Sequence, residues 1–225
     1  MAVGGILFSA PMVQATIDGR KTQTRRVLKP QPEIVDMLAS EEQESLEIEN
    51  RLFGEEGRWI VLAKPLPDEA GVLRWVREPW RTIEDWNHRP PRDLPPAVAP
   101  IQYEATQQGQ VSGKLRPGMF LPRWASRLTL EVTAVRVERL QDISEEDAVA
   151  EGAWRAKASG RFADNYATMA VAGIWFATAR GWYADLWDRI NGPGAWAANP
   201  WVIVRTFDVI KANIDVVLTN RETGG

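Results

Sequence analysis

The longest strand signal in the chain is Arg127-Leu128-Thr129-Leu130-Glu131-Val132-Thr133-Ala134-Val135-Arg136-Val137-Glu138. Apolar residues alternate with polar ones along its first half, which is the pattern of a strand with one buried face. The alternation then slips phase between Val132 and Val135. Such a slip indicates a bulge or bend, which curved sheets and small barrels use to turn a strand. The stretch therefore favours a curved sheet or barrel over a flat sheet.

Shorter strand and helix signals lie on both sides of this stretch. The predicted strands are 5–8, 22–28, 59–62, 72–77, 101–105 and 201–210. Helices are predicted after Ser9, from Ser144 and over 174–190, and Gly19 and Gly152 close the first two. Several strands joined by short helices in one continuous unit predict an α+β fold, a small β-barrel or curved sheet with flanking short helices.

The sequence as a whole predicts one domain over residues 1–215 with two insertions, at about 31–70 and 84–99. The first insertion carries nine acidic residues against one basic residue between Glu33 and Glu56. Such a charge run is typical of a solvated excursion, and we expect it to be helical. The second insertion is a proline-rich loop, and residues 216–225 are expected to form a loose tail.

The composition excludes several functional classes. There is no cysteine and a single histidine, His88, so thiolate or histidine-rich metal sites and a Ser-His-Asp triad are not expected. The 27 basic and 30 acidic residues give a net charge of −3, which argues against a protein that coats long nucleic acids. The N-terminus lacks the pattern of a signal peptide, and we expect a cytoplasmic protein with no membrane partner, no cofactor and no metal requirement.

Two residue patterns suggest chemistry. Lys21 stands just beyond the first predicted helix and Thr24 lies on the strand that follows, so their side chains can converge in the turn. A lysine whose pKa is lowered by burial can activate a hydroxyl where no histidine is available, and a solvated basic turn is the alternative. Glu151 stands in the last turn of its helix, where the helix dipole disfavours negative charge. It suits a proton donor or shuttle, or is an exposed residue without a role.

A series of motifs follows one another along nearly the whole chain. They are Ile6-Leu7-Phe8-Ser9-Ala10-Pro11-Met12-Val13, Asp18-Gly19-Arg20-Lys21-Thr22-Gln23-Thr24-Arg25-Arg26, Trp75-Val76-Arg77-Glu78-Pro79-Trp80, Pro117-Gly118-Met119-Phe120-Leu121-Pro122-Arg123-Trp124-Ala125-Ser126-Arg127, Ile143-Ser144-Glu145-Glu146-Asp147, Glu151-Gly152 and Asn199-Pro200-Trp201-Val202. In this order they resemble the ASCH-domain proteins commonly encoded by phages and prophages. Only the acidic insertion and residues 155–172 stand outside the resemblance.

The resemblance implies a PUA-like β-barrel with helices at its mouth, and a nucleobase or RNA as the ligand. In this superfamily the small N4-acetylcytidine amidohydrolases carry Gly-Arg-Lys-Thr-x-Thr and a glutamate that closes a short helix. By that similarity Lys21, Thr24 and Glu151 form the catalytic group. Thr24 would attack the acetyl carbonyl, Lys21 would take its proton, and Glu151 would position water or protonate the departing amine. Activation of water by Lys21 and Glu151 is an equal alternative.

Further residues are expected to contact the ligand, with guanidinium groups on a phosphate or base edge and an indole for stacking. These are Arg20, Arg26, Arg77, Glu78, Arg123, Trp124 and Arg127. Ion pairing and packing are the alternative roles for them. The expected partner is a modified nucleoside or RNA, in the host cytoplasm if a phage encodes the chain. An RNA-binding module without catalysis and a ribonuclease are the competing functions, and the oligomeric state stays open.

Overall fold

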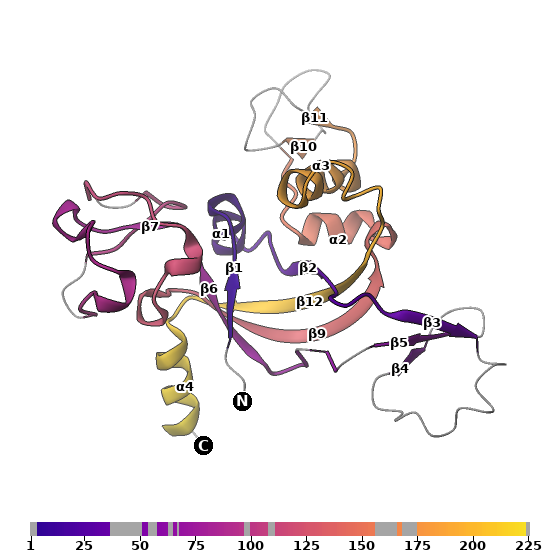
Figure 1. The fold of residues 1–225 in the computed structure, drawn as a ribbon, viewed down its shortest axis with the longest axis horizontal. Coiled ribbons are helices and arrows are strands. Elements are labelled where there is room, and N and C mark those ends of the chain that lie inside the picture. The colour runs from indigo at the N-terminus through magenta and orange to yellow at the C-terminus, as the bar shows by residue number, and fades with distance from the viewer. Residues whose placement is uncertain are drawn as a thin grey trace.

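The computed structural model describes residues 4–36, 51–53, 58–62, 65–66, 68–96, 100–107, 111–155, 166–167 and 175–223. Its largest element is a mixed five-stranded sheet with the order β1-β6-β9-β12-β2 (Figure 1). The strands are β1 (Gly4–Leu7), β6 (Leu73–Arg77), β9 (Thr129–Arg139), β12 (Trp201–Ile210) and β2 (Gln23–Val27). β1 runs parallel to β6, and the other neighbouring pairs are antiparallel.

The two longest strands carry the bulge that the sequence predicts. Thr206 pairs with Ala134 and Phe207 with Val132, so Thr133 is an extra residue on β9. An extra residue bends the strand and increases its twist. Figure 1 shows β9 and β12 as long, curved ribbons. The phase slip in the sequence is therefore confirmed as a bulge, and the sheet is curved.

The two edge strands of the sheet are joined by a side chain. Arg26 of β2 donates a hydrogen bond from Nη2 to the carbonyl oxygen of Leu7, the last residue of β1, over 2.7 Å. Among the described residues no strand pairing connects β1 with β2, so backbone bonds do not close the sheet into a barrel. The described chain thus combines a mixed, curved sheet with a few helices, which agrees with the predicted α+β class.

Helices pack on the sheet at separate places (Figure 1). α1 (Ala10–Ile17) contributes to a core made of Phe8, Val13, Val76, Leu128, Leu130 and Phe207. α2 (Glu145–Ala150) and α3 (Ala179–Asn191) share a second core made of Leu140, Ile143, Ala148, Ala153, Tyr166, Ala179, Tyr183, Trp187, Val202 and Val204. α4 (Ile214–Thr223) packs against β6 in a third core made of Leu73, Trp75, Ile214 and Val217.

The start of α3 is fixed by the neighbouring helix. The Glu145 carboxylate of α2 accepts hydrogen bonds from the backbone amides of Ala179, over 2.7 Å, and Arg180, over 3.3 Å. Thr178 caps the same turn by accepting from the amide of Gly181 over 3.0 Å. These oxygens satisfy amides that the first turn of a helix leaves free, and a carboxylate suits the positive end of the helix dipole. The cap holds α3 in a fixed position relative to α2.

Shorter elements flank the central sheet. The strands β3 (Glu33–Asp36), β5 (Arg58–Val61) and β4 (Arg51–Phe53) pair in the order β3-β5-β4. Two-residue strands form the pairs β7 (Trp80–Arg81) with β8 (Gln102–Tyr103), and β10 (Tyr166–Ala167) with β11 (Trp175–Phe176). The short 3-10 helices are η3 (Glu84–Trp86), η4 (Pro91–Asp93), η5 (Gly118–Phe120), η6 (Arg123–Ala125) and η7 (Leu140–Asp142).

Three predicted elements differ from the structure. The acidic insertion is predicted to be helical, but its described ends are the strands β3 and β4, which both pair with β5, and residues 37–50 lie outside the described residues. The predicted loose tail is the helix α4 as far as Thr223, because Ile214 and Val217 are buried against β6. The helix predicted from residue 174 begins at Ala179, because the residues before it pair as β11.

No helix within the described ranges has the length and apolar character that crossing a bilayer requires.

The core beneath α1 provides a test of the curved sheet. Phe207 is 2% exposed and lies with its ring centroid 6.3 Å from that of Phe8. We expect Phe207→Ala to lower the free energy of unfolding by about 3–5 kcal/mol, because removing a nearly fully buried ring leaves a cavity in the core. The measurement is urea unfolding monitored by tryptophan fluorescence.

The matched control is Asp208→Ala, one residue along β12, where the side chain is exposed. We expect this change to stay within about 0.5 kcal/mol of the parent protein. Equal effects of the two substitutions would contradict the placement of this core.

Candidate active site

Two helix ends meet at the candidate site. α1 is followed by Gly19 with φ +75°, and α2 is followed by Gly152 with φ +107°. Both glycines take the left-handed turn that commonly ends a helix. A Cβ atom at Gly152 would lie 3.1 Å from the Cβ of Ala15 and 3.4 Å from that of Lys21, so the two chain segments approach closely. At this junction Lys21 and Glu151 form a single antiparallel bridge.

The Lys21 side chain is enclosed at the junction, with 0% of the residue exposed. Its Nζ donates to Glu151 Oε2 over 2.6 Å, to Gln23 O over 2.8 Å and to Glu151 O over 3.1 Å. Three acceptors use the three protons of an ammonium group, so this geometry belongs to a charged lysine. Burial lowers the pKa of Lys21 below its ordinary 10.5, and the charge of Glu151 opposes that shift. Lys21 therefore supplies a buried positive charge to the carboxylate.

Arg25 holds the other oxygen of the same carboxylate. It is 1% exposed and donates from Nη1 to Glu151 Oε1 over 3.1 Å, from Nε to Glu138 over 2.9 Å and from Nη2 to Asp147 over 2.7 Å. Arg136, which is more exposed, pairs with the same Glu138 and Asp147. Buried charges are tolerated only where opposite charges and hydrogen bonds surround them. The network therefore ties β2 to β9 and α2.

Tyr183 of α3 completes the surroundings of Glu151. Its hydroxyl donates to Glu151 Oε1 over 3.4 Å. Burial, and then the charge of Glu151, raise the pKa of Tyr183 well above 10.0, so the hydroxyl keeps its proton at neutral pH. The Arg25 guanidinium lies 6.0 Å from the centroid of the tyrosine ring. Donors from β2, α3 and the segment before β2 thus fix one carboxylate in place.

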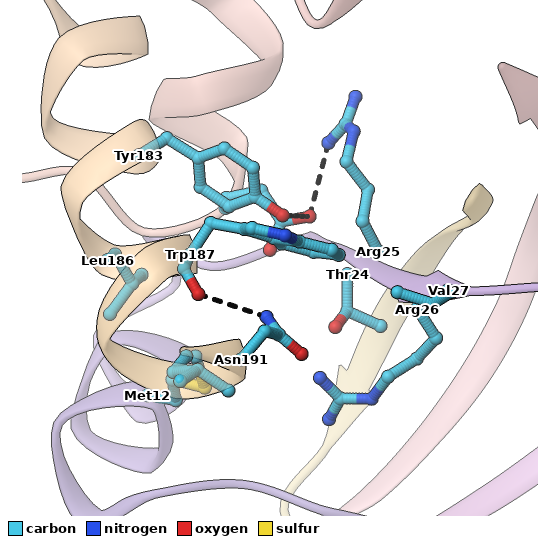
Figure 2. Close-up of a pocket in the computed structure, with 11 residues that line it drawn as sticks. Met12, Thr24, Arg25, Arg26, Val27, Tyr183, Leu186, Trp187 and Asn191 are labelled. Atoms are coloured by element: carbon cyan, nitrogen blue, oxygen red, sulfur yellow. Dashed lines mark hydrogen bonds and ion pairs between the residues drawn. The ribbon is translucent and has the colours of Figure 1, made fainter. Parts of the chain in front are cut away.

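A pocket opens in front of this carboxylate (Figure 2). Its empty space is about 360 Å³, part of which is open to solvent. The polar lining residues are Thr24, Arg25, Arg26, Glu151, Tyr183 and Asn191, and the apolar ones are Met12, Val27, Leu186, Trp187 and Ile190. Figure 2 shows the β2 side chains on one side and the α3 side chains opposite them. An apolar wall with a few polar groups is typical of a small-molecule site.

Several predicted site residues come together here. Thr24, Arg26 and Glu151 line the pocket, and Lys21 binds Glu151 from the interior. The three acceptors of Lys21 Nζ do not include the Thr24 hydroxyl, so the expected Lys21–Thr24 pairing is absent from these contacts. Arg20 lies at the junction, where it donates to the carbonyl oxygen of the residue after Glu151 over 3.2 Å. Glu151, rather than Lys21, is the ionisable member of the predicted catalytic group that lines the pocket together with Thr24.

Glu78 and Arg127 form an ion pair elsewhere. Arg127 donates to both Glu78 oxygens, from Nε over 2.9 Å and from Nη2 over 2.8 Å, and Glu78 is 1% exposed. The guanidinium also lies 4.1 Å from the ring centroid of Tyr103, whose pKa burial raises to about 12. Two parallel bonds and a stacked ring engage the arginine within the protein. This geometry supports a structural role for the pair.

The other predicted ligand contacts also stand outside the pocket lining. Arg123 forms an ion pair with Asp215 of α4. Trp124 packs against the core formed around β7 and η6. Arg77 lies over the Trp75 ring, 4.5 Å from its centroid. The pocket therefore draws on the motif at residues 18–26 and on Glu151, and the motifs around Arg77 and Arg123 serve packing and ion pairs instead.

Eight of the eleven pocket residues were not anticipated as site residues: Met12, Arg25, Val27, Tyr183, Leu186, Trp187, Ile190 and Asn191. Tyr183, Trp187 and Asn191 are spaced four apart in α3, so they share one helix face, and this spacing is visible in the sequence. Arg25 stands beside another arginine in a basic stretch, and nothing in such a stretch marks which residue is buried.

Titration of Lys21 gives a test of its burial. Because its pKa is lowered in the folded state, the unfolded chain holds a proton that the folded chain has released, in the interval between the lowered value and 10.5. The free energy of unfolding should therefore rise with pH in that interval, by at most about 1.4 kcal/mol per pH unit. We expect Lys21→Met to remove this rise, as measured by urea unfolding from pH 7 to 10.

Lys114→Met, at an exposed position, is the matched control and should keep the parent pH slope. Comparing slopes between variants cancels the titration of the tyrosines. An unchanged slope in Lys21→Met would show that Lys21 is not the buried titrating group.

Among the described residues no group of three or more His, Cys, Asp or Glu side chains is placed to hold a metal ion. Comparison of the chain with protein-family models, with curated proteins and with solved structures finds no match.

Proposed function

We propose that the chain is an amidohydrolase that removes an acetyl or related acyl group from the exocyclic amine of N4-acetylcytidine or a similar modified nucleoside. The observation that carries the proposal is the pocket that both Thr24 and Glu151 line, with Lys21 bound to Glu151 over 2.6 Å. Lys21 and Glu151 are 130 residues apart in the sequence. The motif resemblance selects the same three residues independently of their contacts.

We also propose that the fold is a PUA-like ASCH domain. The motif order supports this assignment, and so does the curved sheet whose edge strands are joined by the Arg26–Leu7 hydrogen bond. In such a fold short helices stand at the mouth of the sheet. α1, α2 and α3 lie on one side of the curved strands in Figure 1, and α1 and α3 supply pocket residues.

Glu151 acts as the general base in the proposed reaction. Its carboxylate takes a proton from a water molecule while the water oxygen bonds to the acyl carbon, and the carbonyl electron pair moves onto the acyl oxygen. When this intermediate collapses, the C–N bond breaks and Glu151 returns the proton to the exocyclic nitrogen. The products are the free amine and a carboxylic acid, and the glutamate is regenerated.

The contacts of Lys21 favour water over Thr24 as the nucleophile. An ammonium group with three acceptors has no lone pair to take a proton from the threonine. Thr24 lies in the pocket wall, where its hydroxyl can donate to the acyl oxygen as negative charge develops on it. Lys21 and Arg25 then act as positioning residues, because they hold the Glu151 carboxylate that meets the substrate.

The release of cytidine from N4-acetylcytidine, measured by chromatography, tests the reaction. We expect turnover by the parent protein and a loss of at least about a hundredfold in kcat for Glu151→Gln, because the amide cannot accept a proton. Thr24→Ser should keep most of the activity, since it retains the hydroxyl, and Thr24→Ala should lose about a hundredfold. Glu131→Gln, in a solvent-facing ion pair on β9, is the matched control and should be fully active.

Mass spectrometry of the protein during turnover distinguishes the two nucleophiles. No acetyl group should accumulate on Thr24, because water attacks the substrate directly. An acetyl-threonine adduct would contradict the water route, and absence of cytidine release by well-folded parent protein would contradict the proposed activity itself.

A further inference from the structure

Two polar side chains at the open side of the pocket have unused hydrogen-bonding capacity. Arg26 extends from β2 and Asn191 stands on the last turn of α3, and Figure 2 shows both at the same side of the hollow, near the Thr24 side chain. Neither belongs to the carboxylate network around Glu151. The proposed reaction does not use them, so they are free to contact the hydrogen-bonding edge of the base.

The orientation of the Asn191 amide is fixed by its own helix. Its Nδ2 donates to the carbonyl oxygen of Trp187 over 3.0 Å, which leaves Oδ1 as the atom offered to the pocket (Figure 2). Asn191 therefore presents a hydrogen-bond acceptor. The helix backbone sets this polarity, because a reversed amide would place its oxygen against the carbonyl of Trp187.

Arg26 presents donors to the same space. A guanidinium has five N–H groups, and among the described residues Arg26 uses one hydrogen bond, from Nη2 to Leu7 O over 2.7 Å. That bond anchors the side chain without occupying the rest of the fork. The open side of the pocket thus offers an acceptor on α3 and donors on β2.

This pattern matches one pyrimidine edge and not the other. Cytosine carries an N–H donor on its exocyclic nitrogen beside the acceptors N3 and O2, and an acylated amine keeps one N–H. Uracil has a carbonyl oxygen in place of that amine and N–H at N3. An oxygen of uracil would face Asn191 Oδ1 with no proton between them, and its N3–H would face the donors of Arg26.

We propose that Asn191 and Arg26 read the edge of the base and select a cytosine-type ring over a uracil-type ring. This selection rests on the proposed function, which places the ring with its exocyclic nitrogen toward Glu151. Trp187, which is 5% exposed and lies between Tyr183 and Asn191 on α3, forms part of the apolar wall beside the ring. Asn191 is then the specificity-determining residue and Arg26 contributes affinity.

Binding of cytidine and uridine, measured by isothermal titration calorimetry, tests the selection without requiring turnover. We expect the parent protein to bind cytidine about tenfold or more tightly than uridine, the effect of one satisfied against one unsatisfied hydrogen bond. Asn191→Ala should remove the preference by weakening cytidine binding. Asn220→Ala makes the same change on an exposed position of α4 and should keep the parent preference.

The outcomes separate this inference from the proposed reaction. A cytidine preference that Asn191→Ala abolishes supports the base-reading pair even if N4-acetylcytidine is not hydrolysed. A parent protein that binds both nucleosides equally overturns it, even if hydrolysis is observed. Retention of the preference in Asn191→Ala, with an unchanged melting temperature, also overturns it.

Discussion

The site depends on one carboxylate that is buried together with two cations. Glu151 is 3% exposed, and it accepts a hydrogen bond from Lys21 on one carboxylate oxygen and from Arg25 on the other. If one of these three charges were removed, the opposite charge would stay buried without its partner, where water cannot solvate it. Buried charged groups are therefore found paired and hydrogen-bonded. These charges join the end of α2 to the start of β2. The glycine turns after α1 and α2 let the two chain segments approach closely enough for this contact.

The remaining elements place an apolar wall against that carboxylate. α3 is capped by the Glu145 side chain of α2, so the helix that carries Tyr183 and Trp187 is oriented by the same short helix that ends at Glu151. The bulge in β9 curves the sheet, and the curvature brings Arg26 within reach of β1. A rigid ionic layer therefore lies behind the pocket, and a hydrocarbon and aromatic layer lies in front, which is an arrangement suited to directing one carboxylate at a bound ring.

The sequence predicted those features that depend on local patterns. β12, the bulge in β9 and the serine-capped α2 follow from alternation and capping, and the pairing of Lys21 with Glu151 at one site follows from the motif resemblance. It did not predict which arginine of the Arg25–Arg26 pair is buried, because burial there depends on carboxylates more than a hundred residues away. The helix α4 and the strands at the ends of the acidic segment were also missed, since both gain their stability from contacts that are distant in the sequence.

We propose that Glu151 directs a water molecule at the acyl group of a nucleoside held between β2 and α3. A crystal structure of the Glu151→Gln variant with N4-acetylcytidine tests it most directly. We expect the ring to lie beside Trp187 and Asn191, with a water bound at position 151 and about 3–3.5 Å from the acyl carbon. A nucleoside bound over Arg77 or Trp124, with the pocket in front of Glu151 unoccupied, would contradict the account.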